Sequence, residues 1–556
     1  MGKVWLGGLG VASVLLACGA QHEPRPRWAG PVRVVLIHTA DLHSHVFPEP
    51  TLISAADSRR GLGHAGSVEA VGGMARIATL LREIRRAEPH SLYLDSGDLI
   101  EGTDAFTAFG GEPEMRALSA LRVAAVALGN HDLDPGVSEF LATHRAFGHF
   151  PVLAANYAAP SAGLGGAVAS SVAVNAGGVR IGVIGVANPD SPGGLAAVNN
   201  TYGISLTPVA VAVQDAIDLL RPNVDLVVAI THLGLAADEA MISATSGLDV
   251  VLGGHEHLTL EGPLSRFDCG PAVRAQLGCH ERRVILVHSG AYGRYVGRVE
   301  LSLTPAAAGS GDGLEVSSAE HALLPVSTEV KEDSALAALL EPYRARLAAA
   351  GFDAAVAFAT SPLPRYGAGG GDSALGDLIA DALRARAGAD IALLNTTGIR
   401  ADLPPGVLTK SSFASALPFG DTLTVLHLNG TELNALLEKQ AQLAARRDCQ
   451  SPFQGSGFSV QISCRAGAAS HANRLQVAGK SVEAASAYTL VTTDYLADNG
   501  AGFAVDASKR FALGADSDPL DIVLAAVRQR AVCGAEALPC LDPTQLQDGR
   551  ITVDAR

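Results

Sequence analysis

The chain has 556 residues, of which 48% are hydrophobic and 17% are charged, and its formal net charge is −15. This length exceeds what a single hydrophobic core usually serves, so we expect at least two domains with well-developed cores. The acidic balance argues against a nucleic acid polymer or an anionic membrane surface as an electrostatic partner. A nucleotide substrate is still compatible with it, because a metal site can supply local positive charge.

The N-terminus has the pattern of a bacterial lipoprotein signal peptide. Lys3 precedes an apolar run over residues 4–17 that is too short to span a bilayer, and "LLAC" ends at Cys18. "LLAC" resembles a lipobox, in which the cysteine is lipidated; the alternative is an ordinary signal peptide with an incidental cysteine. We expect residues 1–18 to be a signal peptide and 19–31 a tether. The mature protein would then be a periplasmic or cell-surface lipoprotein, attached to a membrane through Cys18.

Strand-like apolar runs follow, and each ends in polar residues: "RVVLIHTADLH", "LYLDSGD", "VAAVALGNHD", "VDLVVAITH" and "DVVLGGHEH". Continuous apolar runs are typical of strands that are buried on both faces. Between the first two, Ile77, Leu80, Leu81 and Ile84 have helical spacing. Alternation of strand and helix predicts an α/β domain over residues 32–330. In such domains, sites lie beyond the carboxyl ends of the strands, where these polar clusters fall.

A linking helix is predicted over residues 331–352. Its apolar stripe consists of Leu336, Leu339, Leu340, Tyr343 and Leu347. Pro342 predicts a kink in this helix, because proline lacks a backbone N–H.

A second α/β pattern begins after this helix, over residues 353–556. In "DSALGDLIADALRARAG" we expect a helix capped by Asp372 or Ser373, followed by the strand-like "IALLN".

The cysteines other than Cys18 form three close pairs along the chain: Cys269 with Cys279, Cys449 with Cys464, and Cys533 with Cys540. An even number of cysteines in an exported chain favours disulfides. Pairing of neighbours is the simplest connectivity, although spacing alone does not exclude the others.

The polar strand ends offer ligands for metal ions: Asp41, His43, Asp98, Asn130, His232, His255 and His257. Carboxylate, imidazole and amide oxygen are ligands of Zn²⁺, Mn²⁺ or Fe. They suffice for two ions if one carboxylate bridges them. Two ions about 3.5–4 Å apart can clamp a phosphoryl group and ionise the attacking water. A single strand-end histidine is more often structural, but stability gives no reason for so many such clusters.

Together, "HTADLH", "SGD", "GNHDLD", "THLG" and "GGHEH" resemble the calcineurin-like metallophosphoesterases, specifically the bacterial 5′-nucleotidase and UDP-sugar hydrolase family. "LGDLIADAL", "NTTGIRADLPPG", "LPFGDTL" and "DYLADNGAGF" are similar to that family's substrate domain. The resemblance covers roughly residues 32–505. It implies an N-terminal four-layer α/β/β/α metallophosphoesterase sandwich, the linking helix, and a C-terminal α/β substrate-binding domain.

The resemblance also implies residue roles. Metal 1 is held by Asp41, His43, Asp98 and His257. Metal 2 is held by the bridging Asp98 with Asn130, His232 and His255.

His131 resembles the family's catalytic histidine, and Asp134 is expected to orient it. Asn395 and Arg400 match substrate-contacting positions, while Phe419 and Tyr495 match the two aromatic residues that sandwich the base. We assign no role to Asp132 and expect His38 and His45 to be structural.

Three features depart from the family pattern. Thr396 and Thr397 replace two glycines, which narrows a loop that is usually open. A glycine run stands where the family has an arginine before "LGDL", and Arg365 is the nearest substitute. Ala501 replaces the ribose-binding aspartate, so the nucleoside pocket is altered.

We therefore expect an exported, lipid-anchored phosphohydrolase with two divalent metal ions that cleaves nucleotide phosphomonoesters by metal-hydroxide attack. Alternatives within the superfamily are a 2′,3′-cyclic nucleotide phosphodiesterase and a thiosulfohydrolase. An alternative of another class is a non-catalytic surface binding lipoprotein, which the ligand set and the His131–Asp134 pair disfavour. The sequence predicts neither the native metal nor the oligomeric state.

Overall fold

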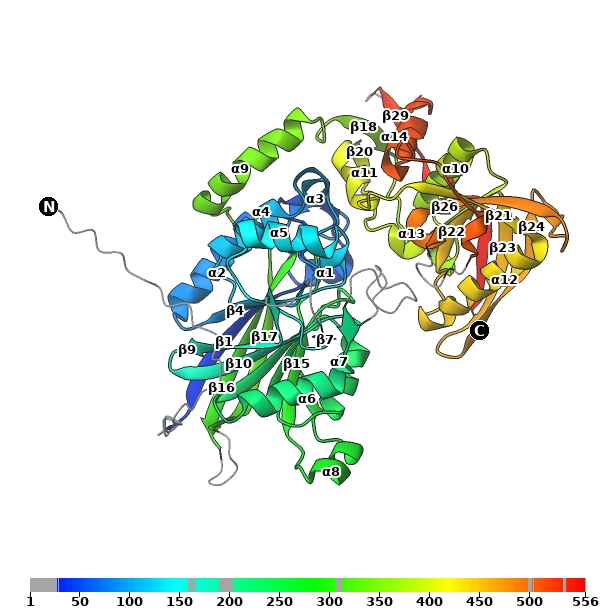
Figure 1. The fold of residues 1–556 in the computed structure, drawn as a ribbon. Helices are drawn as coiled ribbons and strands as arrows, with labels where there is room; N and C mark the ends of the chain where they lie inside the picture. The colour runs from blue at the N-terminus through cyan, green and yellow to red at the C-terminus, as the bar shows by residue number, and fades with distance from the viewer. Residues whose placement is uncertain are drawn as a thin grey trace.

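The computed structural model describes residues 28, 30–158, 164, 167–189, 204–306, 313–498, 503, 505–533 and 537–555. The described chain forms two α/β domains joined by a helix (Figure 1). Cys18, the proposed signal peptide, most of the proposed tether and Ala501 lie outside the described residues.

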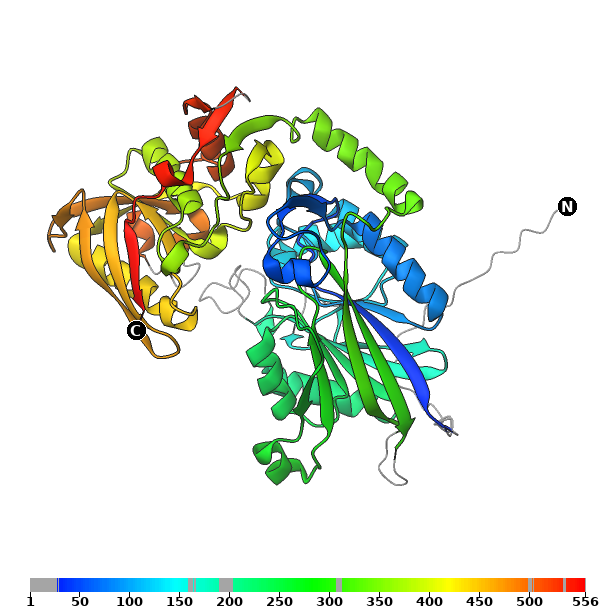
Figure 2. The same ribbon diagram turned by 180° about the vertical axis from the view of Figure 1, so that it is seen from behind.

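The N-terminal domain is built on two sheets. The first has the strand order β17-β16-β1-β4-β5-β6-β8, and the second β14-β15-β13-β12-β10-β9. The strands of the first sheet are β1 (Val32–Thr39), β4 (Leu92–Asp95), β5 (Ala125–Ala127), β6 (Val152–Leu153), β8 (Val168–Ala169), β16 (Tyr295–Pro305) and β17 (Leu314–Pro325). Those of the second are β9 (Ser171–Ala176), β10 (Val179–Val186), β12 (Leu226–Thr231), β13 (Val250–Gly253), β14 (Leu264–Phe267) and β15 (Arg283–His288). Figure 2 shows the blue β1 beside the long green strands β16 and β17.

Alternate residues of β1 serve two different cores. Val34 and Leu36 pack into the core between the two sheets, whereas Val35 and Ile37 pack toward the helices. The first sheet is covered by α2 (Met74–Ala87), α4 (Glu112–Ala120) and α5 (Val137–Phe147), and the second by α6 (Val209–Leu220) and α7 (Leu235–Ser243). These layers confirm the expected four-layer α/β/β/α sandwich (Figure 1).

The strands that end in polar residues run parallel within each sheet. β1, β4 and β5 are parallel in the first sheet, and β10, β12, β13 and β15 in the second. Their carboxyl ends therefore lie at one edge of each sheet, which brings the predicted ligands together.

The predicted linking helix is α9 (Ser334–Ala349). Its apolar stripe buries Leu336, Leu340, Tyr343 and Leu347, and it contacts helices α2, α4 and α3 (Asp104–Phe109). The helix continues through Pro342. Burial of this stripe favours the helix even where proline removes a hydrogen bond.

The C-terminal domain contains the central sheet β22-β19-β26-β21-β27. Its strands are β19 (Ile391–Asn395), β21 (Leu423–Asn429), β22 (Phe453–Ser456), β26 (Ala487–Thr493) and β27 (Arg510–Ala512). The helices α10 (Ala374–Ala387), α12 (Gly430–Ala441) and α14 (Pro519–Arg528) pack around it.

Two smaller sheets complete this domain, with orders β20-β18-β29-β28 and β25-β24-β23-β30. Their strands are β18 (Ala355–Ala359), β20 (Gly406–Thr409), β28 (Val532–Cys533), β29 (Leu538–Leu541), β23 (Phe458–Arg465), β24 (Ala469–Val477), β25 (Lys480–Ser481) and β30 (Ile551–Ala555).

The cap of α10 is Ser373, one of the two residues expected there. Its side chain accepts a hydrogen bond from the backbone N–H of Gly376. The carboxylate of Asp372 instead accepts from the backbone N–H groups of Gly549 and Arg550, and so holds the C-terminal segment against α10.

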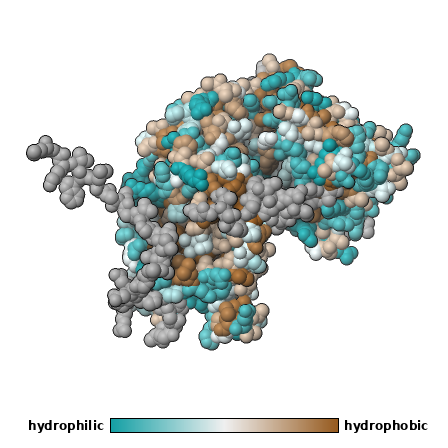
Figure 3. Space-filling model, in the orientation of Figure 1, coloured by the Kyte–Doolittle hydropathy of each residue, from teal (hydrophilic) through white to brown (hydrophobic). Residues whose placement is uncertain are grey.

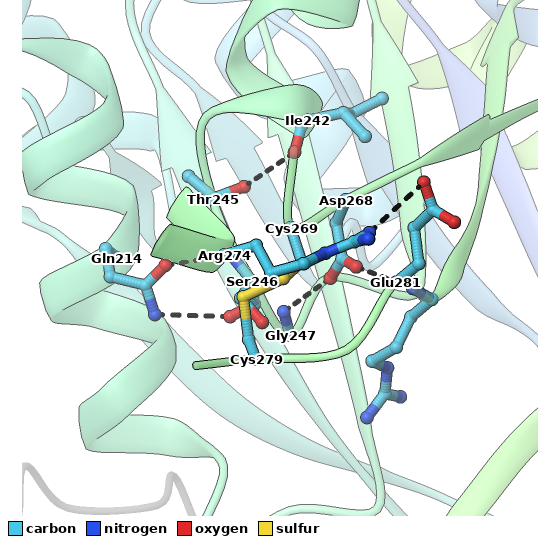
Figure 4. Close-up of a disulfide and its surroundings, with 11 residues drawn as sticks. Gln214, Ile242, Thr245, Ser246, Gly247, Asp268, Cys269, Arg274, Cys279 and Glu281 are labelled. Carbon is cyan, nitrogen blue, oxygen red and sulfur yellow. Dashed lines mark hydrogen bonds and ion pairs between the residues drawn. A yellow bond between two sulfur atoms is a disulfide. The ribbon is translucent and has the colours of Figure 1, made fainter. Parts of the chain in front are cut away.

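The cysteines pair as the simplest connectivity predicts: Cys269–Cys279, Cys449–Cys464 and Cys533–Cys540 are disulfides. Figure 4 shows the first, which closes the turn around α8 (Pro271–Leu277). The neighbouring Asp268 accepts hydrogen bonds from the backbone N–H groups of Gly247, at 2.6 Å, and Arg282, at 2.8 Å.

On the face shown in Figure 3, hydrophilic side chains are spread over both domains. Among the described residues, none of the helices combines the length and hydropathy that crossing a membrane requires.

Candidate active site

The predicted metal ligands follow the carboxyl ends of five strands. Asp41 and His43 follow β1, Asp98 follows β4, Asn130 follows β5, His232 follows β12, and His255 and His257 follow β13. All seven converge at one edge of the two sheets.

At this edge, six of them form two groups. Asp41, His43 and His257 form one, and Asp98, His232 and His255 the other; within each, the ligand atoms lie within 4.8 Å of one another. Asn130 joins the second group, because its Oδ1 is 3.0 Å from Nδ1 of His255. These groups agree with the two ligand sets that the resemblance implied.

Asp98 lies between the two groups. Its Oδ2 is 2.9 Å from Nε2 of His232 in its own group and 3.6 Å from Nε2 of His43 in the other. A carboxylate in this place can bridge two metal ions, as expected for Asp98.

The histidines of this site present free nitrogens to one another. Nδ1 of His43 donates to the carbonyl of Glu101 at 2.9 Å, and Nδ1 of His232 donates to the carbonyl of Ser96 at 2.7 Å. These bonds leave Nε2 of each ring as an acceptor that faces the group, and Nε2 of His43 is 3.2 Å from Nε2 of His257. Two ring nitrogens this close need a proton or a cation between them, so the donor set fits bound metal.

The backbone of the site supports the same conclusion. Positive φ angles occur at Asp41 (51°), His43 (44°), Asp98 (53°), His255 (81°) and His257 (57°). Residues other than glycine seldom adopt this left-handed conformation, and it costs on the order of 1–3 kcal/mol each. In addition, burial raises the pKa of Asp41 to about 7, because a carboxylate loses its hydration when it is buried.

His131 lies next to the two groups, between carboxylates. Its Nδ1 is 2.6 Å from Oδ2 of Asp134, as predicted, and also 2.6 Å from Oε2 of Glu101. Burial lowers the pKa of His131, but the charges of Glu101, Asp134 and Asp98 outweigh it and hold this pKa well above its usual value. These carboxylates favour the protonated form of the ring, in which Nε2 can act as a donor.

Sequence reasoning missed two residues of this site. Glu101 is one, although its place in the polar turn after β4 was a signal. Asp132 is the other: its carboxylate accepts from the backbone N–H groups of Gly129 at 2.8 Å, Leu99 at 2.8 Å and Asp98 at 3.2 Å. Asp132 thereby ties the turn that carries Asp98 to the turn that carries Asn130.

His38 is a buried structural residue, as expected, with its ring nitrogens 2.8 Å from Ser289 Oγ and 2.9 Å from Ser96 Oγ. Nδ1 of His45 donates to the carbonyl oxygen of His43 at 2.8 Å. This hydrogen bond can stabilise the backbone at His43.

Arg400 and Phe419 reach this edge from the C-terminal domain. Nη2 of Arg400 is 3.2 Å from Nε2 of His43, and the ring of Phe419 is 5.9 Å from that of His131. Nη1 of Arg365 donates to the carbonyl of Arg400 at 2.7 Å, so Arg365 lies beside the predicted phosphate-binding arginine. An interdomain cavity of about 450 Å³ is lined by residues that include His43, Arg365 and Arg400.

Asn395 and Phe419 line a second, smaller pocket, together with Asp421. Thr397 accepts a hydrogen bond from the side-chain amide of Asn395 at 3.0 Å. The hydroxyl of Thr396 is buried against Ser451 and does not face this pocket. Tyr495 is half-buried against the core of the C-terminal domain, so its stacking role stays a prediction.

Two family models match the chain. The calcineurin-like phosphoesterase model matches residues 34–258, and the model of the 5′-nucleotidase C-terminal domain matches residues 354–507. The chain is 28% identical over 453 residues to a 5′-nucleotidase of Bos taurus, covering 76% of this chain and 74% of that protein. It is 28% identical over 461 residues to a 5′-nucleotidase of Homo sapiens, covering 77% and 74%.

Solved structures agree with these matches. A 5′-nucleotidase precursor from Thermus thermophilus superimposes with a TM-score of 0.79 at 26% identity, covering 94% of this chain and 99% of that one. A sulfate thiohydrolase, SoxB, shares the fold with a TM-score of 0.70 at 16% identity, covering 94% and 96%. The chain therefore belongs to the 5′-nucleotidase family of calcineurin-like metallophosphoesterases, whose members are metal-dependent phosphoric ester hydrolases.

Proposed function

We propose that this protein is an exported phosphohydrolase that cleaves nucleotide phosphomonoesters with two divalent metal ions, such as Zn²⁺ or Mn²⁺. The observation that carries the proposal is the pair of ligand groups around Asp98, with Arg400 of the other domain beside them. One ion would be held by Asp41, His43, His257 and Asp98. The other would be held by Asp98, Asn130, His232 and His255.

When bound, the two ions supply positive charge to the phosphoryl oxygens and lower the pKa of the attacking water. Arg400 adds a planar guanidinium, which binds phosphate oxygens with two parallel hydrogen bonds. His131 is held protonated by Asp134 and Glu101, so its Nε2–H stabilises the oxygen on which charge develops as the ester bond breaks.

The nucleoside is proposed to bind on the side of Phe419. The ring of Phe419 lines the small pocket together with Asn395. The ring of His131 lies 5.9 Å from it, so the reacting phosphoryl group is proposed to lie on the His131 side of Phe419. A base stacked on an aromatic ring contributes about 1–3 kcal/mol. Tyr495 is proposed as the second aromatic partner of the base.

Export is proposed from the signal-peptide pattern and the disulfides, which persist in oxidising compartments. The relatives include 5′-nucleotidases of snake venom and the 5′-nucleotidase precursor named above, and these support the same proposal. Attachment to the membrane is proposed through a lipid on Cys18. The proposed domains are residues 32–330 and 353–556, with the linking segment 331–352 between them.

The test is a substrate panel on the soluble form that begins at residue 22, with Mn²⁺ or Zn²⁺ added. We expect phosphate release from nucleoside 5′-monophosphates, and loss of that activity after chelation with recovery when metal is returned. The panel also contains 2′,3′-cyclic nucleotides, thiosulfate esters and p-nitrophenyl phosphate. A higher kcat/KM for the cyclic or thiosulfate substrates than for the monophosphates would contradict the proposal, and the absence of hydrolysis with every substrate would contradict it as well.

A further inference from the structure

The imidazole of His131 has two carboxylate partners that come from different turns. Asp134 belongs to the turn of His131 itself, whereas Glu101 belongs to the turn after β4. Both carboxylates lie 2.6 Å from Nδ1. Nδ1 offers a single N–H, so one partner would satisfy it, and a second negative group at the same nitrogen needs a separate reason.

Glu101 is far more buried than Asp134. Glu101 is 2% exposed, while the side chain of Asp134 is 24% exposed. The carboxylate of Glu101 pairs with Nδ1 of His131 at 2.6 Å, and its oxygens have no other hydrogen bond among the described residues. Burying a carboxylate is costly unless a positive partner is held beside it. Contact with His131 is the compensation that the described surroundings of Glu101 provide.

The main chain of Glu101 is fixed as firmly as its side chain. Glu101 has a φ of 70°, and its carbonyl accepts the hydrogen bond from Nδ1 of His43 at 2.9 Å. The next residue, Gly102, has a φ of 135°, and a Cβ there would lie 2.8 Å from the carbonyl oxygen of His43. The turn is thus folded directly onto a predicted metal ligand, so the carboxylate of Glu101 has a set position relative to the metal-ligand groups.

We propose that Glu101 is a positioning residue that acts through His131. Together with Asp134, it holds the imidazole ring so that Nε2 faces the reacting phosphoryl group. Because the backbone of Glu101 is hydrogen-bonded to His43, it also fixes the orientation of the ring relative to the metal-ligand groups. This inference rests on the proposed function, in which His131 stabilises the leaving oxygen. Asp134 alone would tie the ring only to its own surface turn.

The principal test is Glu101→Gln in the soluble chain from residue 22, loaded with Mn²⁺. Glutamine keeps the size of the side chain but cannot form the carboxylate–imidazole pair with His131. We expect kcat for a nucleoside 5′-monophosphate to fall about 10–100-fold, the scale at which supporting partners of a catalytic site act, with KM and metal content unchanged. The loss is expected to be smaller with p-nitrophenyl phosphate, whose leaving group needs little proton donation.

A double-mutant cycle separates this role from a purely structural one. In the His131→Ala background, Glu101→Gln is expected to cause no further loss, because a residue that acts through His131 has no effect once that ring is gone. An equal loss in both backgrounds, or a fall in bound metal, would show that Glu101 acts through His43 instead, and the inference would be wrong.

A second variant avoids the buried position. Asp134→Asn changes the more exposed partner, and we expect it to lower kcat less than His131→Ala does, because Glu101 still holds the ring. An Asp134→Asn variant as impaired as His131→Ala would overturn the inference. The matched control is Glu114→Gln, which is expected to keep normal kcat. Glu114 is also 2% exposed, but it has no ion pair to His131 among the described residues.

Failure of the inference and failure of the proposed function give different results. A normal kcat for His131→Ala overturns the catalytic role of His131, and with it this inference. A reduced kcat for His131→Ala together with a normal kcat for Glu101→Gln overturns the inference alone.

Discussion

Asp98 is the side chain predicted to bridge the two metal-ligand groups, and it lies between them. Its Oδ2 faces His232 and His43, and its Oδ1 accepts the backbone N–H of His131 at 2.8 Å. Asp98→Asn keeps an oxygen for that backbone hydrogen bond but removes the bridging charge. We expect bound metal to fall below two ions per chain and turnover to drop by more than about 10²-fold, as when a preorganised charged group is lost. Elemental analysis and phosphate release measure the two effects.

Circular dichroism of the same variant shows whether it is folded. Two ions per chain with normal turnover in Asp98→Asn would contradict both the bridging role and the assignment of the metal site.

At the scale of a turn, Asp132 holds two elements together. It accepts backbone hydrogen bonds from Gly129, Leu99 and Asp98, and it is fully buried. Asp132→Ala leaves these N–H groups without partners, and each buried unsatisfied group costs about 1–3 kcal/mol. We expect the free energy of unfolding in urea to fall by about 2–5 kcal/mol, and metal affinity to fall about 10–100-fold because ligand turns are no longer supported. A variant with unchanged stability and metal affinity would mean that water replaces the carboxylate.

The Cys269–Cys279 disulfide, unlike Asp132, lies in a loop that contains no predicted site residue. It closes a short loop, with a sequence separation of 10, around α8 (Figure 4). A disulfide of this span restricts the unfolded chain and contributes about 2–3 kcal/mol. Cys269→Ser with Cys279→Ser is expected to lower the melting temperature while kcat and KM stay normal, because no predicted site residue belongs to this loop. Calorimetry measures the melting temperature, and a nucleotidase assay measures kcat and KM. A change in kcat would show that this loop does influence the site, and the prediction would be wrong.

The sequence predicts elements whose cause is local. The apolar runs of β1, β4, β5, β12 and β13 locate both the strands and the polar residues after them, because periodicity and the ends of strands are visible in one dimension. The helix at 74–87 and the cap at Ser373 follow from spacing and side-chain chemistry in the same way.

Other features depend on contacts between distant segments. Glu101 lies in the polar turn after β4, but its contact with His131 joins two separate turns and is not visible in the sequence. The partners of Asp132 are likewise backbone groups of other turns. Pro342 fits inside α9 because the helix is buried along its stripe. The positive φ angles of the predicted ligands likewise cannot be predicted from residue type alone, because most aspartate and histidine residues have negative φ even though both types tolerate positive φ better than most.

At the scale of the molecule, the site is assembled from two domains. The N-terminal domain supplies both ligand groups and His131, while the C-terminal domain brings Arg400 and Phe419 within contact distance of His43 and His131. Neither domain alone contains both the predicted metal ligands and the predicted phosphate-binding Arg400. The relative position of the domains therefore controls whether the site is complete.

The place of the whole molecule in the cell is predicted to depend on one residue near its N-terminus, Cys18. The apolar run over residues 4–17 is too short to cross a bilayer, and "LLAC" puts Cys18 where a lipid would be attached. We expect Cys18→Ser to move the protein from the membrane fraction to the soluble fraction, and to abolish labelling by a radioactive fatty acid. Its kcat is expected to match that of the soluble form from residue 22, because the predicted ligands begin at Asp41. This comparison separates release from misfolding. Unchanged membrane association of Cys18→Ser would show that another part of the chain makes the attachment, and the lipoprotein prediction would be wrong.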